Sequence, residues 1–330
     1  MKRQLVIKHE SWPISGKFSI SRGSKTSAEI VLVEINVEDK KGRGECVPYP
    51  RYQETVESVI AQIETTRYFI EHGITRQDLQ SLLPAGAARN ALDCALWDLE
   101  AKQNNTSVGQ KLGCEPLHPI TSTYTISLGT PEEMGKAASL HADKPLLKIK
   151  LSGQQDIERL LEIRKNAPNA RLIIDPNESW TFDQLQSYMP ALIKIGIELI
   201  EQPLPAKQDQ QISNYNFPII LCADESCHDR SYLPSLKNKY QAVNIKLDKT
   251  GGLTEALSML NESRTRGFKI MVGCMVGTSL AMAPAMFLAQ NADWVDLDGP
   301  LLLAYDRDPG LILKNNQLYY PDIGLWGSLS

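Results

Sequence analysis

The sequence predicts an α/β fold, a TIM-like (β/α)7β barrel with an N-terminal α+β capping domain. The main observation is a regular alternation of short apolar runs and helical stretches from about residue 119 onward. The second is the different pattern before it, strand-like at first and helical afterwards. We expect the capping domain at 1–115 and the barrel, with a metal and catalytic site, at 116–310. The tail, about 311–330, is expected to return to the capping domain.

The capping region has four recognisable segments. Residues 28–37 are strand-like, and the charged, glycine-containing segment 39–44 predicts a turn. Residues 55–70 and 87–102 have the apolar spacing of helices. Alanine supplies much of the apolar stripe in the second of these helices, which indicates close helix packing rather than chemistry.

The barrel region contains eight strand candidates, most of them separated by helical stretches such as 156–166, 181–195 and 254–266. The strand candidates are 121–127, 146–150, 172–175, 197–201, 219–224, 242–246, 270–274 and 294–298. Eight evenly spaced parallel strands favour closure into a barrel over the alternative, a doubly wound open sheet. Little helical pattern follows the eighth strand, so we expect the last helix of the barrel to be missing.

The composition excludes several classes of protein. A content of 42% hydrophobic and 22% charged residues is that of a globular chain, not of a disordered or fibrous one. The net charge of −4, without a basic run, argues against nucleic acid as a partner. The N-terminal residues lack the apolar core of a signal peptide, and the best apolar stretch, 280–289, is too short to span a bilayer. The six cysteines form no CxxC pair, which favours free thiols in a reducing cytoplasm over disulfides or zinc.

Three acids stand out by their placement. Asp175, Glu201 and Asp224 each end a short apolar run, and they are spaced by about one strand, one helix and the connecting loops. The carboxyl ends of barrel strands share one mouth, so these carboxylates are expected to converge. Three close carboxylates repel one another, and hard oxygen ligands select Mg²⁺ or a similar ion to neutralise them. A single acid at a strand end is commonly a turn former or helix cap, but three at near-equal spacing favour a metal site.

Three lysines accompany these acids. Strand periodicity places Lys148 and Lys150 on one face, and Lys246 lies on the other side of the strands that carry the acids. Two lysines across from each other beside Mg²⁺ suit proton transfer at a carbon next to a carboxylate. Lys150 is then the neutral base, its pKa lowered by Lys148 and the metal, and Lys246 is the acid on the opposite face. Such a pair inverts the carbon, so the reaction is a racemisation or an epimerisation.

These residues resemble the enolase superfamily and, more narrowly, its muconate-lactonising subgroup. The resemblance rests on Lys-x-Lys at 148–150, on the three acids, and on Lys246 within the segment 244–252. It covers essentially the whole chain, including 91–98 in the first domain. It implies Lys150 and Lys246 as the acid/base pair and Lys148 as an electrostatic helper. We also expect one Mg²⁺ per subunit and a homo-oligomer.

The last barrel strand carries Asp296 and Asp298 on one face. They could simply cap the loop before Gly299. Within the subgroup, however, they match the Asp-x-Asp with which dipeptide epimerases hold the α-ammonium group of a small dipeptide substrate. The resemblance therefore implies epimerisation of L-Ala-D/L-Glu-type dipeptides by two-base 1,1-proton transfer at the glutamyl α-carbon, in the recycling of murein peptides.

The residue that binds the glutamate side chain of the substrate is expected in the segment 19–26, whose small and polar residues suit a mobile loop over the barrel mouth. In related epimerases this loop supplies an arginine to that side chain, and Arg22 falls at or next to its position. Lys25 is the substitute candidate. Arginine is favoured because its planar fork matches a carboxylate better than an ammonium group does.

Two other interpretations of the function remain. One is a different reaction on the same scaffold, o-succinylbenzoate synthesis or N-acylamino-acid racemisation. Those substrates carry no free α-ammonium group, so Asp296 and Asp298 argue against them. The other is a catalytically silent barrel that binds a metal and a ligand, against which the intact pair of Lys150 and Lys246 argues.

Overall fold

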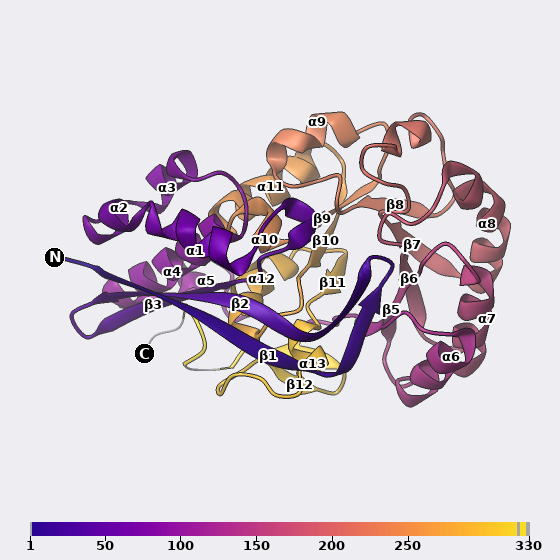
Figure 1. Ribbon diagram of the computed structural model, residues 1–330, viewed down its shortest axis with the longest axis horizontal. Helices are drawn as coiled ribbons and strands as arrows, with labels where there is room; N and C mark the ends of the chain where they lie inside the picture. The colour runs from indigo at the N-terminus through magenta and orange to yellow at the C-terminus, as the bar shows by residue number, and fades with distance from the viewer. Residues whose placement is uncertain (1, 322–323, 328–330) are drawn as a thin grey trace.

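The second part of the chain forms an eight-stranded parallel sheet in the computed structural model, which describes residues 2–321 and 324–327 (Figure 1). The strands follow one another around the sheet in sequence order, as β4 (Tyr124–Ile126), β5 (Leu146–Lys150), β6 (Arg171–Asp175), β7 (Ile197–Glu201), β8 (Ile220–Ala223), β9 (Ala242–Ile245), β10 (Lys269–Gly273) and β11 (Trp294–Asp296). The amide of Thr123 donates to the carbonyl of Val295 over 2.8 Å and links the first strand to the last. The sheet is therefore a nearly closed barrel, because consecutive order leaves no reversal of the kind that defines a doubly wound sheet.

Helices connect most of the strands, as expected. The connecting helices are α6 (Pro131–Leu140), α7 (Asp156–Asn166), α8 (Phe182–Ile195), α9 (Leu233–Leu236), α10 (Leu247–Thr250), α11 (Leu253–Thr265) and α12 (Ser279–Ala289), with 3₁₀ turns η2 (Asp209–Ile212) and η3 (Arg230–Tyr232); α13 (Gly299–Leu302) follows the last strand. The connection from β7 to β8 contains only the turn η2. Beyond β11 comes the one-turn α13, so the described structure has the expected (β/α)7β form without a full last helix.

Capping residues explain where several of these helices begin and end. The side chain of Thr181 accepts from the amide of Gln184, whose own side chain accepts from the amide of Thr181. This capping box starts α8, and Gly196, at a φ of +82°, ends it. An equivalent box, Thr130 with Glu133, starts α6.

The interior of the barrel is layered, and the layering positions the polar residues. One apolar side chain from each of seven strands fills the lower interior: Leu146, Ile173, Leu199, Cys222, Ala242, Met271 and Trp294. Because side chains alternate along a strand, the residues two positions further on point to the same interior. Those residues are Lys148, Asp175, Glu201, Asp224, Asn244, Gly273 and Asp296. A polar layer therefore lies directly above an apolar one at the carboxyl ends of the strands.

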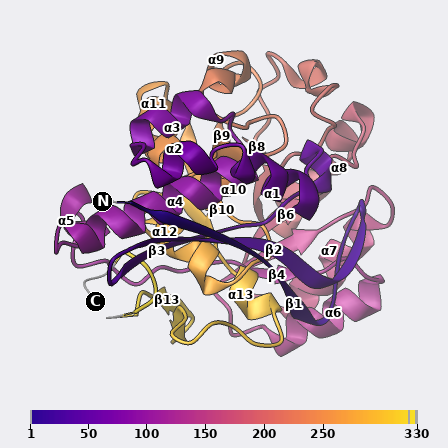
Figure 2. The same ribbon diagram turned by 60° about the vertical axis from the view of Figure 1, so that its left-hand side comes forward.

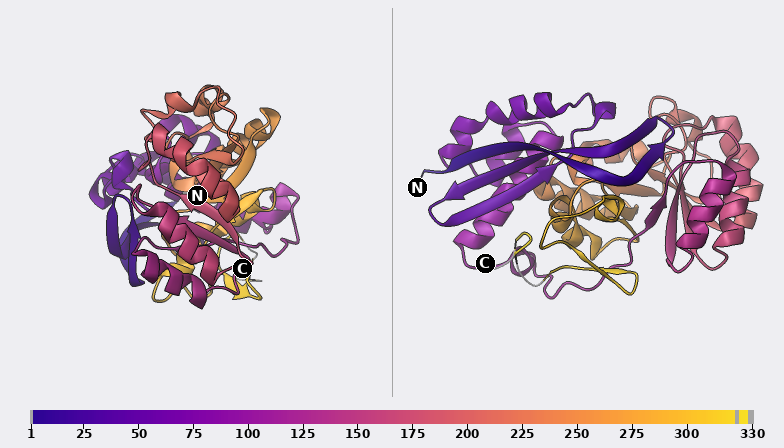
Figure 3. Two further views of the ribbon diagram at one scale, coloured as in Figure 1. Left: turned by 90° about the vertical axis from the view of Figure 1, so that its right-hand side faces the viewer. Right: turned by 60° about the horizontal axis from the view of Figure 1, so that its bottom comes forward.

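The first part of the chain is an antiparallel sheet packed against helices (Figures 2 and 3). Its strands are β1 (Gln4–Ile20), β2 (Gly23–Val37) and β3 (Lys40–Cys46). Its helices are the 3₁₀ turn η1 (Pro50–Tyr52) and α1 (Val56–Glu64), α2 (Arg67–Glu71), α3 (Arg76–Leu82), α4 (Ala87–Gln103) and α5 (Val108–Leu112). The β1–β2 hairpin extends from the capping sheet toward the barrel strands, as the right-hand view of Figure 3 shows.

Two local expectations in this part are wrong. The segment 19–26, expected as a mobile loop, is mostly strand, because β1 and β2 pair up to Ile20 and Gly23 and leave a tight hairpin tip. The expected helix 55–70 is divided into α1 and α2. The break falls at Thr65 and Thr66, whose hydroxyl groups donate to the carbonyls of Gln62 and Ile63. Such hydroxyl groups compete with the helical hydrogen bonds.

The C-terminal segment forms a small hairpin, β12 (Ile312–Lys314) with β13 (Gln317–Tyr319), and then reaches the capping helices. The indole N–H of Trp326 donates to the carbonyls of Arg43 and Cys94 at 2.9 and 3.1 Å. The amide of Gly327 donates to Asp98. The division of the chain into 1–115, 116–310 and a returning tail stays a prediction.

Candidate active site

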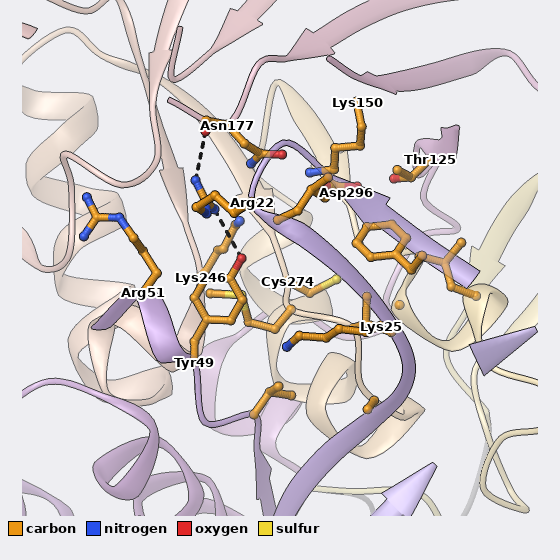
Figure 4. A pocket seen from close by; sticks show the side chains of 18 of the residues that line it. Arg22, Lys25, Tyr49, Arg51, Thr125, Lys150, Asn177, Lys246, Cys274 and Asp296 are labelled. Carbon is orange, nitrogen blue, oxygen red and sulfur yellow. Dashed lines mark hydrogen bonds between the residues drawn. The ribbon is translucent and has the colours of Figure 1, made fainter. Parts of the chain in front are cut away.

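The polar layer of the barrel opens into a cavity of about 450 Å³ beneath the β1–β2 hairpin. The hairpin contributes Phe18, Ile20, Arg22 and Lys25 to its wall, and the segment after β3 contributes Tyr49 and Arg51 (Figure 4). The barrel contributes Lys148, Lys150, Asp224, Lys246, Asp296 and Asp298. The cavity thus joins eight of the ten side chains predicted for the site, with Asp175 and Glu201 buried just below it.

Lys148 lies at the centre of the polar layer. Its ammonium group is 2.6 Å from Glu201 Oε2, 2.6 Å from Asp296 Oδ2 and 3.4 Å from Asp175 Oδ2. Burial opposes the charged form, but these three carboxylates outweigh it and hold the pKa of Lys148 well above its ordinary value. Lys148 is therefore held as a positive charge among three carboxylates.

The two lysines predicted as the acid/base pair reach the cavity from opposite sides of the barrel. Lys150 extends from β5, where its Nζ is 2.6 Å from Asp175 Oδ2, and Lys246 follows β9. Strands β5 and β9 are four positions apart in a ring of eight, which places them across the barrel from each other. Lys246 Nζ is 2.7 Å from Asp224 Oδ2 and 3.9 Å from Glu201 Oε1. Burial opposes its charge, yet the two acids raise the pKa of Lys246.

The three acids predicted to bind metal end the adjacent strands β6, β7 and β8. Burial and repulsion by Asp175 raise the pKa of Glu201 to about 7, whereas Lys150 and Lys148 overcome burial and lower the pKa of Asp175 to about 2. The lysine ammonium groups stand between the carboxylates. Consequently no three acidic, histidine or cysteine side chains form a ready-made metal cluster within the part of the chain that is described.

The donor chemistry fits a hard divalent cation. Three fully buried carboxylates face one polar layer, and Asn177 on the cavity wall has a buried side-chain oxygen without a hydrogen-bond donor. Oxygen-only donors of this kind suit Mg²⁺ rather than softer metals. Asp175, Glu201 and Asp224 are the residues that would hold it.

Asp296 and Asp298 are tied to the first barrel strand. Asp296 accepts from the Thr123 hydroxyl at 2.5 Å and from Lys148, and Asp298 accepts from the amide of Thr125 at 2.6 Å. Burial, followed by repulsion from Asp296, raises the pKa of Asp298 to about 7. Both carboxylates reach the cavity wall, so they can meet a cationic group of a ligand.

Arg22 and Lys25 both line the cavity but have different surroundings (Figure 4). The Arg22 guanidinium is 2.8 Å from Glu225 Oε1 and 3.3 Å from Glu178 Oε2, and it donates to the carbonyl of Asn177 at 3.0 Å. These contacts fasten the hairpin tip to the barrel. Lys25 forms no ion pair within 2–321 and 324–327, and its Nζ is 5.2 Å from the centre of the Tyr49 ring.

Several residues of this site were not predicted, because the sequence around them has no distinctive pattern. Thr123 and Thr125 lie at the first barrel strand, 173 residues before their partners Asp296 and Asp298. They form hydrogen bonds with these acids only because the sheet closes. Arg51, which forms two hydrogen bonds to Glu178, lies in the 3₁₀ turn η1, whose sequence has no recognisable pattern. Lys249 is the exception. It follows Lys246 by one helical turn, and that spacing could have indicated that its side chain returns toward the strand ends.

The fold and this polar layer define an enolase-type barrel with a capping domain. Residues 134–321 match the family model of the enolase C-terminal domain-like barrel. Residues 2–113 match the N-terminal domain of mandelate racemase and muconate lactonizing enzyme. The chain belongs to the mandelate racemase and muconate lactonizing enzyme family, within the enolase superfamily.

Two curated relatives are similar over nearly their whole length. One, an L-Ala-D/L-Glu epimerase from Escherichia coli strain K12, is 46% identical over 319 residues, 96% of this chain and 99% of the relative. The other, an N-acetyl-D-glutamate racemase from a Pseudoalteromonas species, is 45% identical over 302 residues, 90% of this chain and 95% of the relative.

Solved structures of the superfamily superpose closely. An enolase family member from Agrobacterium tumefaciens, with homology to dipeptide epimerases and with bound sodium and L-Ala-L-Glu, is 48% identical with a TM-score of 0.97 and covers 98% of this chain and 100% of its own. A dipeptide epimerase from Methylococcus capsulatus, in complex with Mg and L-Arg-D-Lys, is 30% identical with a TM-score of 0.90 and covers 100% and 99%.

Proposed function

We propose that this chain is a Mg²⁺-dependent epimerase of L-Ala-D/L-Glu-type dipeptides. The observation that carries the proposal is the placement of Lys150 and Lys246 on opposite sides of one cavity, four strands apart around the barrel. A substrate α-carbon between them meets a proton carrier on each face. The name of the 46% identical relative, an L-Ala-D/L-Glu epimerase, supports the same substrate class.

The proposed reaction is a two-base 1,1-proton transfer at the glutamyl α-carbon. One lysine removes the α-proton as a neutral amine and the other, as an ammonium ion, delivers a proton to the opposite face. When bound, Mg²⁺ neutralises the charge that develops on the substrate's carboxylate. Lys148, held charged by three carboxylates, adds a fixed positive charge to the same wall of the cavity. For the reverse direction the two lysines exchange roles.

The two ends of the dipeptide require opposite charges on the cavity wall. Asp296 and Asp298 supply negative charge for the α-ammonium group at the β11 end. Arg22 and Lys25 supply positive charge for the glutamate side chain at the hairpin. Arg22 already compensates Glu225 and Glu178, so Lys25, which has no ion pair among the described residues, is as strong a candidate as Arg22.

The cellular setting follows from the substrate class and from the family resemblance. We propose one Mg²⁺ per subunit, a homo-oligomer, and a cytoplasmic role in the recycling of murein peptides, which contain Ala-Glu. Within the described residues no helix is long and apolar enough to cross a membrane.

A second candidate is racemisation of an N-acylglutamate, because one relative at 45% identity is named N-acetyl-D-glutamate racemase. The structure also shows Asp296 already paired with Lys148, which reduces the net negative charge available to an ammonium group. Measuring kcat/KM for L-Ala-L-Glu, L-Ala-D-Glu and both enantiomers of N-acetylglutamate separates the two. We expect the dipeptides to be preferred at least tenfold. A preference for N-acetylglutamate would replace the proposal with the second candidate.

A further inference from the structure

The buried lysine behind the third acid, Lys249, is not part of the chemistry described above. It lies in the one-turn helix α10 and its side chain is fully buried. Its ammonium group is 2.6 Å from Asp224 Oδ1, 2.7 Å from the carbonyl oxygen of Asp224 and 2.9 Å from the carbonyl oxygen of Asn244. An ammonium group has three protons, so these three acceptors use all of them.

The two oxygens of the Asp224 carboxylate therefore have different surroundings. Oδ1 is held by Lys249, which does not line the active-site cavity. Oδ2 is 2.7 Å from Lys246, which does line the cavity. The contacts of Lys249 to the backbone at the ends of β8 and β9 fix it in place. Only one oxygen of Asp224 is therefore available on the cavity side.

We propose that Lys249 is a positioning residue that restricts Asp224 to a single metal-binding oxygen and thereby makes the site selective for Mg²⁺ over Ca²⁺. The inference rests on the proposed function, since it takes Asp224 as a metal ligand. Mg²⁺ demands near-ideal octahedral geometry and commonly binds through one oxygen per carboxylate together with water. Ca²⁺ takes six to eight oxygens and often binds both oxygens of a carboxylate. A carboxylate with one oxygen committed to a buried ammonium group cannot provide the second.

The proposal predicts that removal of the Lys249 ammonium group benefits Ca²⁺ more than Mg²⁺. The test is isothermal titration of the purified enzyme with each ion, in the wild type and in Lys249→Met. The quantity compared is the ratio of the Ca²⁺ to the Mg²⁺ dissociation constant. Both ions carry the same charge, so the loss of a nearby positive charge affects both constants and largely cancels in the ratio. We expect the ratio to fall at least fivefold in Lys249→Met.

Lys102→Met is the matched control. Lys102 is a partly buried lysine of the capping domain that contacts one carboxylate, Asp98, and one carbonyl, that of Lys41, and it lies outside the cavity. Its substitution tests the general effect of losing such a contact, and the ratio should stay at the wild-type value. A fall of less than fivefold in Lys249→Met, or an equal fall in Lys102→Met, overturns the proposal.

A crystal structure of the wild type with Mg²⁺ gives an independent answer if Lys249→Met does not fold. The proposal expects Asp224 to bind Mg²⁺ through Oδ2 alone, with Lys249 still bonded to Oδ1. Binding through both oxygens, or displacement of Lys249, contradicts it. Failure of the wild type to bind Mg²⁺ overturns the proposed metal dependence as well. A Mg²⁺-dependent epimerase with an unchanged ratio overturns only the role of Lys249.

Discussion

Eight of the side chains at the barrel mouth form a set that is balanced in charge before any ligand arrives. Four buried acids pair with four buried lysines: Asp175, Glu201, Asp224 and Asp296 with Lys148, Lys150, Lys246 and Lys249. A divalent cation makes this set positive overall. That excess of charge attracts the substrate's α-carboxylate, and burial strengthens the attraction because water screens it little. The proposed chemistry therefore uses both the metal and the lysines.

Asp298 offers the clearest test of the ammonium anchor, because its side chain forms no ion pair or hydrogen bond with a lysine among the residues that the structure describes. Asp298→Asn removes a buried charge that only a free dipeptide can use. We expect kcat/KM for L-Ala-L-Glu to fall at least tenfold more than kcat/KM for N-acetylglutamate, a difference of about 1.4 kcal/mol or more. Steady-state kinetics with both substrates measures this.

Asp296→Asn is the comparison for that variant. Asp296 also holds Lys148 at 2.6 Å, so its loss should weaken the turnover of both substrates, with the dipeptide still affected more. Equal losses on both substrates in both variants would assign the two aspartates to structure.

The second prediction at this scale concerns the side-chain cation that binds the glutamate side chain of the substrate. Arg22→Ala and Lys25→Ala each remove a positive charge from the hairpin wall of the cavity. At least one of them should raise KM for L-Ala-L-Glu about tenfold while it spares an alanyl dipeptide with a neutral second residue. Competition between the two dipeptides gives the preference directly. If neither variant changes the preference for glutamate, the determinant lies elsewhere in the cavity.

At the scale of elements, the position of the hairpin depends on the packing of β3 against α4. A Cβ atom added to Gly44 would lie 2.0 Å from the carbonyl oxygen of Ala91 and 2.8 Å from the amide nitrogen of Ala95. Both are backbone atoms of α4, so the helix itself would have to move. We expect Gly44→Ala to lower the free energy of unfolding by about 3 kcal/mol. Chemical denaturation measures the change.

Gly16→Ala is the control for that substitution. A Cβ atom at Gly16 meets nothing within 4 Å, but φ is +83°, a conformation that costs a side chain about 1 kcal/mol. A loss in Gly44→Ala no larger than the loss in Gly16→Ala would show that the close approach of β3 and α4 does not limit stability.

The sequence predicted the elements that periodicity specifies and missed those set by long-range contacts. The strand ends that carry Lys150, Glu201 and Asp224 lie within one residue of their expected positions, because apolar runs and terminal polar residues mark them. The connection before β8 lacks a helix, and nothing local in 202–219 signals this. The hairpin tip near Arg22 was expected as a loop, since its small polar residues pair only across the strands.

In the candidate site too, the features that local periodicity specifies could be predicted and those set by long-range contacts could not. The residue types and spacing of the predicted acids and lysines place them in one layer, because strand period and barrel topology determine where they point. The ammonium groups between the carboxylates could not be predicted, since their positions depend on side-chain conformations at the centre of the barrel. The ion pairs of Arg22 with Glu178 and Glu225 join segments more than 150 residues apart and leave no pattern in the sequence.

At the scale of the whole molecule, the cap and the barrel are joined by a buried polar contact. Glu45, at the end of β3, accepts from the amide of Thr278 at 2.9 Å and from Arg307 at 2.9 Å. Asp248, two residues after Lys246, accepts from the amide of Val47 at 3.1 Å. The barrel wall and the capping residues around the cavity are therefore connected, which fixes the cavity between two parts of the chain.

The whole enzyme should depend on Mg²⁺. Removal of divalent cations with a chelator should abolish turnover, and addition of Mg²⁺ should restore it, because the paired acids and lysines have no excess positive charge to attract an anionic substrate or to neutralise the charge that develops on its carboxylate. Mg²⁺ should also raise the melting temperature, since it binds the folded state. Full activity of the chelator-treated enzyme, verified metal-free by elemental analysis, would contradict the proposed dependence on Mg²⁺.

The exchange of the glutamyl α-proton in D₂O tests the central claim most directly. With Mg²⁺ and either L-Ala-L-Glu or L-Ala-D-Glu, NMR should show deuterium at the glutamyl α-carbon and formation of the other diastereomer. Lys150→Ala and Lys246→Ala should each block epimerisation, while each retains exchange with only one of the two diastereomers through the remaining lysine. Normal epimerisation in either variant, or exchange with both diastereomers in one of them, would contradict the assignment of the two lysines to opposite faces.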